Sequence, residues 1–116
     1  MEIQIFGTKK CTDTRKALRF FSERRVRTHF VDLKQKAASV GELRRFVQKF
    51  GVDGVMDRES KRSLSLGLHQ AGYSPERWIE ILAEEPLTLR TPLVRWRHRL
   101  TIGHAAETWK AWMEEA

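Results

Sequence analysis

Cys11 is the only cysteine in the chain, and its neighbours are of the kind that make a thiol reactive. It follows a short apolar run, Ile3–Phe6, and a polar turn, and it precedes a segment whose apolar residues have helical spacing. A cysteine at such a junction lies near the positive end of the helix dipole, and Lys9, Lys10 and Arg15 add positive charge. Because this setting lowers a cysteine pKa from about 8.5 towards roughly 3.5–7.5, we predict that Cys11 is a nucleophilic thiolate.

The alternative for Cys11 is a buried, inert small residue, since free cysteine is among the most buried residue types. The polar and basic residues beside it argue against that interpretation. A single cysteine excludes an internal disulfide framework and indicates a reducing, cytoplasmic compartment. One cysteine and four scattered histidines also make a poor metal site, so we expect no metal and no bound cofactor.

The length and composition favour one small folded domain. The chain has 116 residues, 41% of them hydrophobic, which is enough for one modest core. We therefore predict a single domain spanning 1–116. No apolar stretch approaches the roughly 20 residues of a membrane span, and the first residues have a strand pattern rather than that of a signal peptide, so no membrane association is expected.

The net charge is +7, and arginines supply most of the positive charge in three clusters, 24–27, 44–45 and 95–99. The planar guanidinium suits oxyanions, although a solvated basic surface that keeps the protein soluble is the simpler explanation for each cluster. The last cluster places Trp96 among arginines, as in proteins that bind single-stranded nucleic acids. A hairpin with one face in the core accounts for the same residues, so we do not expect direct nucleic-acid binding.

The first third of the chain predicts a parallel βαβ unit. Residues 2–6 and 28–32 have strand patterns, and the segment from about 12 to 24 between them is helical. Such crossovers are almost always right-handed.

The middle of the chain predicts helices with clear start signals. Ser39 and Glu42 form a capping box, and Gly51 ends the helix that follows. The charged segment 52–65 is expected to be irregular, and Pro75 begins a second helix.

The last third predicts a ββα unit. Residues 93–96 and 99–102 are expected to pair as an antiparallel hairpin around Arg97 and His98, before a helix over 107–114. The element order predicts an α/β, thioredoxin-like fold, with a four-stranded mixed sheet flanked by helices and a helical insertion at about 39–86.

The segment Ile5–Ala17, a strand and loop followed by a cysteine, three residues and an arginine, resembles the active site of arsenate reductase-like (ArsC/Spx-type) proteins. Asp57-Arg58 resembles a pair that usually ends in arginine in this family. Thr91–Val94 resembles the segment that holds a cis-proline, which would be Pro92, and Arg99–Gly103 resembles the hairpin return. These similarities occur in order over nearly the whole chain.

The resemblance implies a thiol-dependent reductase. Cys11 would be the nucleophile and Arg15 its catalytic partner, while Arg58 and Arg90 would bind the oxyanion. Glutathione would be the co-substrate, with glutaredoxin as the partner protein. The alternatives are that Arg15 is a surface helix residue and that Arg58 is a loop cation paired with Asp57 or Glu59.

Departures from the family pattern bear on both functions. Thr91 stands where an arginine usually precedes the proline, so the set of oxyanion-binding arginines is incomplete and a second function is open. Thr14 occupies the second position of a would-be Cys-x-x-Cys motif, so the dithiol redox switch of Spx-type regulators is missing. A single thiol can form a mixed disulfide but cannot resolve it internally. The alternative is an Spx-like, non-catalytic regulator that binds a protein such as RNA polymerase.

Overall fold

A computed structural model describes residues 1–116 and divides them into two compact units. The first unit combines the two ends of the chain, 1–32 and 91–116, and the second comprises 33–90. None of the helices is both long and apolar enough to cross a membrane.

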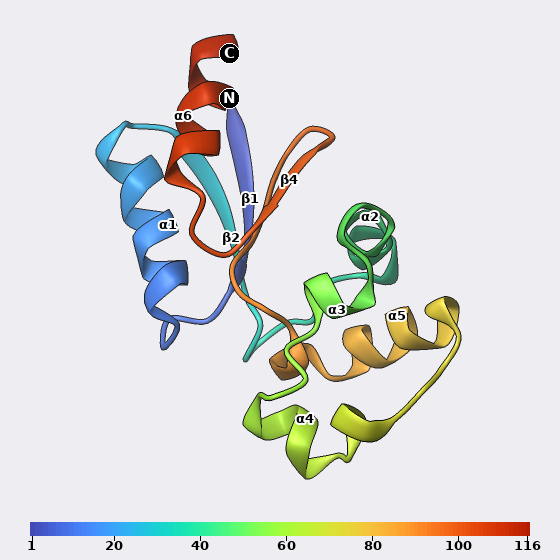
Figure 1. The fold of residues 1–116 in the computed structure, drawn as a ribbon. Helices are drawn as coiled ribbons and strands as arrows, with labels where there is room; N and C mark the ends of the chain where they lie inside the picture. The colour runs from blue at the N-terminus through green and yellow to red at the C-terminus, as the bar shows by residue number, and fades with distance from the viewer. The chain divides into compact units, whose positions relative to one another are not determined.

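The first unit contains a four-stranded mixed sheet in the order β2-β1-β3-β4 (Figure 1). Its strands are β1 (Glu2–Gly7), β2 (Arg27–Asp32), β3 (Leu93–Trp96) and β4 (Arg99–Ile102). Ile5 of β1 pairs with Phe30 of the parallel β2 and with Val94 of the antiparallel β3, and Val94 pairs in turn with Thr101 of β4. The predicted βαβ unit, hairpin and mixed sheet are therefore confirmed.

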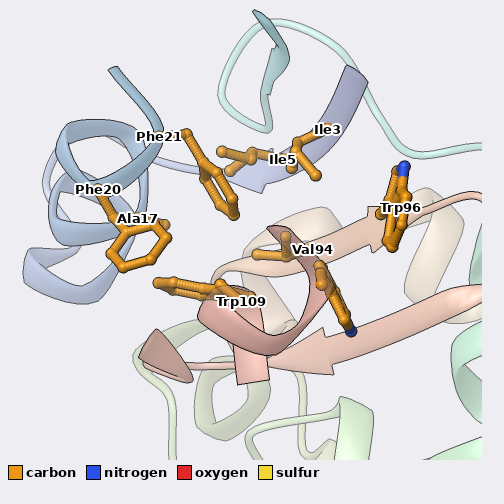
Figure 2. Close-up of a cluster of buried hydrophobic side chains, with 9 residues drawn as sticks. Ile3, Ile5, Ala17, Phe20, Phe21, Val94, Trp96 and Trp109 are labelled. Carbon is orange, nitrogen blue, oxygen red and sulfur yellow. The ribbon is translucent and has the colours of Figure 1, made fainter. Parts of the chain in front are cut away.

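Two helices of this unit, α1 (Thr12–Glu23) and α6 (Ala106–Glu115), share one hydrophobic core with the sheet. Figure 2 shows aromatic side chains of both helices meeting aliphatic side chains of β1 and β3. The buried cluster consists of Ile3, Ile5, Ala17, Phe20, Phe21, Val94, Trp96, Trp109 and Trp112. Trp109 is fully buried, and its indole N–H donates to the Thr101 hydroxyl at 2.8 Å, because a buried indole needs a hydrogen-bond partner. This core fixes the position of α1, which Cys11 directly precedes.

The basic hairpin around Trp96 is part of this core. Trp96 is only 5% exposed, and the guanidinium groups of Arg97 and Arg99 lie over its ring at 5.3 and 5.5 Å. A ring so covered is not available to stack on a base. The hairpin interpretation therefore accounts for this cluster of basic and aromatic residues.

The second unit is helical. Its elements are α2 (Val40–Phe50), α3 (Val52–Val55), α4 (Lys61–Ser65), α5 (Pro75–Glu84) and the 3-10 turns η1 (Leu68–Gln70) and η2 (Pro86–Thr88). The predicted cap at Ser39 is present, since its hydroxyl accepts from the Glu42 N–H at 3.1 Å. The helix that Pro75 begins is capped by the Ser74 hydroxyl, which accepts from the Arg77 N–H at 3.2 Å. Gly51 ends α2 with a φ of 76°, which glycine adopts without strain.

The prediction that 52–65 is irregular was wrong, because this segment contains α3 and α4. Val55 and Met56 are fully buried and anchor α3, while the Ser60 hydroxyl caps α4 by accepting from the Ser63 N–H at 3.1 Å. Helices this short have little intrinsic stability and depend on tertiary packing, so local sequence patterns do not reveal them.

Candidate thiol site

Cys11 is the N-cap residue of α1. Its backbone is extended, its N–H donates to the Thr8 carbonyl at 3.1 Å, and its own carbonyl accepts from the Arg15 N–H at 3.1 Å. At an N-cap, the side chain faces the free N–H groups of the second and third helical residues. The Cys11 sulfur thus occupies the place where a serine or aspartate oxygen usually caps a helix, and it is only partly buried.

The loop before β3 supplies a second group next to the sulfur. The Cys11 thiol donates to the Thr91 carbonyl oxygen at 3.7 Å, and the Thr91–Pro92 peptide bond is cis. Pro92 is buried, and its carbonyl accepts from the Gly103 N–H at 2.9 Å. The first unit therefore brings together Cys11 and the proline segment, which lie 80 residues apart in the sequence.

The pKa of Cys11 is lowered from its ordinary value by hydrogen bonding. Burial acts in the opposite direction and is the largest single effect, since it raises the pKa by disfavouring the charged form. The side chains of Thr14 and Thr91 and the backbone N–H groups of Thr14 and Asp13 together outweigh it. These donors favour the thiolate, which is the form that acts as a nucleophile.

Arg15 braces the loop beside the cysteine. Its guanidinium donates to the Lys9 carbonyl at 2.7 Å and to the Thr12 hydroxyl at 3.2 Å. The hydrogen-bond donors named above, rather than the charges of Lys9, Lys10 and Arg15, lower the Cys11 pKa. The predicted catalytic role of Arg15 stays a prediction.

A shallow basic groove runs along α1 from its first turn. It has a volume of about 220 Å³ and is lined by Thr12, Arg15, Lys16 and Arg19. These residues follow one face of the helix at spacings of three and four. Three cations and one hydroxyl on this face suit an anionic ligand.

Arg58 and Arg90 belong to the second unit, where both contact Asp53. The Arg58 Nε pairs with an Asp53 carboxylate oxygen at 2.5 Å, and the Arg90 Nε donates to the Asp53 carbonyl at 3.2 Å. The acidic partner of Arg58 is thus Asp53, not Asp57 or Glu59.

The remaining contacts of Arg58 also lie within the second unit. Its Nη1 donates to the carbonyls of Leu68 and Ala71 at 3.1 and 3.4 Å, and its guanidinium lies over the Trp78 ring at 4.9 Å. The guanidinium therefore has a structural use in this unit. That Arg58 and Arg90 bind an oxyanion stays a prediction.

Thr14 is the residue near the sulfur whose role the sequence interpretation missed. The sequence suggested only that a second cysteine is absent at this position. The structure buries the Thr14 side chain completely and brings its hydroxyl close enough to the Cys11 sulfur to lower the thiol pKa. The spacing in the sequence could have indicated this proximity, because residues three apart lie on the same side of a helical turn.

No group of three or more His, Cys, Asp and Glu side chains is arranged to hold a metal ion. The chemistry that the partly buried Cys11 sulfur can perform is that of a thiol: nucleophilic attack, mixed-disulfide formation and thiol exchange.

Comparison with known proteins identifies the family. A family model described as the ArsC family matches residues 6–112. The chain belongs to the ArsC family. The match includes Cys11, the proline segment and the whole helical unit.

Two named relatives within this family differ in function. The global transcriptional regulator Spx of Lactococcus lactis is 26% identical over 113 residues, covering 96% of this chain and 86% of the relative. The arsenate reductase of Neisseria meningitidis is 25% identical over 113 residues, covering 95% and 97%. Membership therefore leaves both an enzyme and a regulator as candidate functions.

Solved structures agree on the fold. The arsenate reductase from Vibrio cholerae superimposes with a TM-score of 0.79 at 22% identity, covering 93% of this chain and 94% of that chain. At this identity, the similarity establishes the fold alone. The predicted α/β, thioredoxin-like fold is confirmed.

Proposed function

We propose that this chain is a thiol-dependent oxidoreductase of the ArsC family, with the Cys11 thiolate as its nucleophile and glutathione as its external reductant. The observation that carries the proposal is the position of the partly buried Cys11 sulfur at the N-cap of α1 and beside the Thr91 carbonyl, a setting that lowers its pKa. An inert structural cysteine needs neither the helix N-terminus nor converging hydrogen-bond donors. The proposed compartment is the reducing cytoplasm, where glutathione is available.

The proposed substrate is arsenate, and the electrons balance with two thiols. The Cys11 thiolate attacks the arsenic atom, forms an S–As bond and displaces one oxygen as water after protonation. A glutathione thiol then attacks the Cys11 sulfur, the S–As electron pair stays on arsenic, and As(V) becomes As(III), which leaves as arsenite. The two thiols have become one mixed disulfide between Cys11 and glutathione.

The mixed disulfide has to be resolved from outside. Cys11 is the only cysteine, and Thr14 stands where a resolving cysteine would be. A further thiol, from another glutathione or from glutaredoxin as the partner protein, attacks the glutathione sulfur of the mixed disulfide and releases the Cys11 thiolate.

Positive charge is needed because the thiolate and the arsenate are both anions. The groove on α1 supports the proposal, since Arg15, Lys16 and Arg19 line it directly after Cys11 in the sequence. Arginine can bind a tetrahedral oxyanion through two parallel hydrogen bonds. In our proposal Arg15 has this role first, and Arg58 and Arg90 are the further candidates that the family resemblance implies.

The test is arsenate reduction coupled to glutathione and glutaredoxin, with wild type and Cys11→Ser compared. We expect activity in the wild type and none above background in the variant. Circular dichroism of both proteins controls for folding. Mass spectrometry after treatment with oxidised glutathione should show one adduct on wild type and none on Cys11→Ser. A wild type that neither reduces arsenate nor forms the adduct would overturn the proposal.

The Spx relative supports a second candidate, a regulator that binds RNA polymerase. The chain would then act by binding another protein, and the Cys11 thiolate would not be needed as a nucleophile. Capture of purified RNA polymerase by wild type and Cys11→Ser alike, together with no arsenate reduction, would favour this candidate. No binding at micromolar concentrations would count against it.

A further inference from the structure

The Thr14 hydroxyl is a buried polar group without a hydrogen-bond partner. The side chain is 0% exposed, and the structure gives its Oγ1 no donor or acceptor. Buried hydroxyls are nearly always paired, because an unpaired one keeps the full cost of leaving water. The exception requires a physical reason, and its position next to the Cys11 sulfur suggests one.

The room for this hydroxyl comes from Gly7 at the end of β1. A Cβ atom on Gly7 would lie 2.4 Å from the Thr14 Oγ1 and 2.7 Å from its Cγ2. Any larger residue at position 7 would therefore displace the Thr14 side chain, whichever way its hydroxyl turned. Because Gly7 has no side chain, the end of β1 leaves space for the Thr14 side chain against the strand backbone.

We infer that the Thr14 hydroxyl is a built-in hydrogen-bond donor to the Cys11 thiolate, held in place by the space above Gly7 and left unpaired until the thiolate forms. The inference deepens the proposed function and depends on it, since it specifies how the thiolate is stabilised. Thr14 thereby has a role of its own at the position where a resolving cysteine is absent.

The protonation state of the sulfur explains why the hydroxyl is unpaired. In the structure the thiol proton points to the Thr91 carbonyl, at 3.7 Å. The sulfur is then a weak acceptor, and the Thr14 hydroxyl makes no hydrogen bond with it. Loss of the proton turns the sulfur into a charged acceptor, and hydrogen bonds to charged groups are stronger.

The neighbouring backbone N–H groups are also placed to stabilise a negative charge on the Cys11 sulfur. The Thr14 hydroxyl is close enough to the sulfur to favour the thiolate and so lower the pKa of Cys11, together with the N–H groups of Asp13 and Thr14 itself. These are the second and third residues of α1, whose N–H groups have no partner within the helix. The Thr14 side chain adds one donor to the two that the helix already offers.

The experiment compares alkylation of Cys11 by iodoacetamide across pH in wild type, Thr14→Val, Thr14→Ser and Thr108→Val. Valine has the shape of threonine without the hydroxyl, and serine restores the hydroxyl. Thr108 is a matched control, because it is the third residue of α6 in the same unit and is exposed. The single cysteine makes every alkylation event a report on Cys11.

At pH values below the folded pKa of Cys11, we expect Thr14→Val to react about tenfold more slowly than wild type, because its thiolate loses a charge-assisted hydrogen bond. Its rate-against-pH curve should move to higher pH, whereas Thr14→Ser and Thr108→Val should follow wild type. Thr14→Ala replaces Thr14→Val if the valine variant does not fold, since it also removes the hydroxyl.

Equal curves for wild type and the variant without the hydroxyl would overturn the inference, as would a failure of Thr14→Ser to restore the wild-type curve. This failure is distinguishable from failure of the proposed function. If the alkylation rate of wild-type Cys11 rises at a pH no lower than in the unfolded chain, the proposed thiolate itself is refuted. A low wild-type curve that does not change in Thr14→Val leaves Cys11 reactive and removes only the role of Thr14.

Discussion

The Cys11 thiol in the first unit and the Arg58 guanidinium in the second use their hydrogen-bonding capacity in opposite ways. Beside Cys11, one buried hydroxyl has no partner, and the thiol donates one long hydrogen bond of 3.7 Å to the Thr91 carbonyl. The Arg58 guanidinium, in contrast, is engaged with a carboxylate, two carbonyls and an aromatic ring. Unused hydrogen-bonding capacity costs stability and is typical of functional sites, whereas saturated groups hold a fold together.

The largest effect that tests this contrast is expected from Arg58→Ala. The variant loses the contacts with Asp53, Leu68, Ala71 and Trp78, and we expect the free energy of unfolding to fall by about 2 kcal/mol. Urea denaturation measures this loss.

Arg45→Ala is the control for that variant, because Arg45 is exposed on α2 and the structure gives it no hydrogen bond or ion pair. Equal losses in the two variants would contradict a stabilising role for Arg58. A loss of arsenate reduction in Arg58→Ala at unchanged stability would assign Arg58 to oxyanion binding instead.

Gly7→Ala should have the next largest effect. The added methyl overlaps the Thr14 side chain, and overpacking of a buried site costs typically about 1–3 kcal/mol. We expect a lower free energy of unfolding and slower alkylation of Cys11, because Thr14 is displaced. Gly72→Ala is the control, since a Cβ there would meet no atom within 4 Å. A stable Gly7→Ala variant with wild-type alkylation would refute the role given to this space.

Thr14→Val should raise stability while it lowers reactivity. Removing an unpaired buried hydroxyl in favour of a methyl group of the same shape is expected to add about 1 kcal/mol to the free energy of unfolding. Thermal and urea denaturation at a pH where Cys11 is protonated measure the gain. A loss of stability there would mean that the hydroxyl already has a partner in the thiol form.

The smallest expected effect is the pH dependence of stability that Cys11 itself causes. Its pKa is lower in the folded than in the unfolded state, so the folded state releases the proton first. The stability of wild type relative to Cys11→Ser should therefore rise with pH between the folded pKa and the unfolded value of about 8.5, and be constant above it. Urea denaturation at several pH values tests this, and a difference that is independent of pH would contradict the lowered pKa.

Local patterns predicted the elements that position Cys11, because the apolar run of β1 and the helical spacing of α1 act over a few residues. The cap at Ser39 predicted the start of α2 in the same way. The partner of Arg58 was not predictable in this way. It depends on α3, a four-residue helix that forms through the burial of Val55 and places Asp53 beside the guanidinium.

The unpaired hydroxyl of Thr14 was hidden for a similar reason. The sequence shows a threonine three residues after a cysteine, but the burial of its side chain depends on packing against Gly7 across the loop between β1 and α1. Sequence spacing indicates which side of the helix a residue faces, but not whether its polar atom finds a partner.

The most direct test of the central claim is the pKa of Cys11 in the folded protein compared with the same chain unfolded in urea. Ultraviolet absorbance of the thiolate measures both values, and the single cysteine makes the signal unambiguous once Cys11→Ser is subtracted as background. Our account predicts a lower pKa in the folded protein. A folded value equal to or above the unfolded one would contradict it.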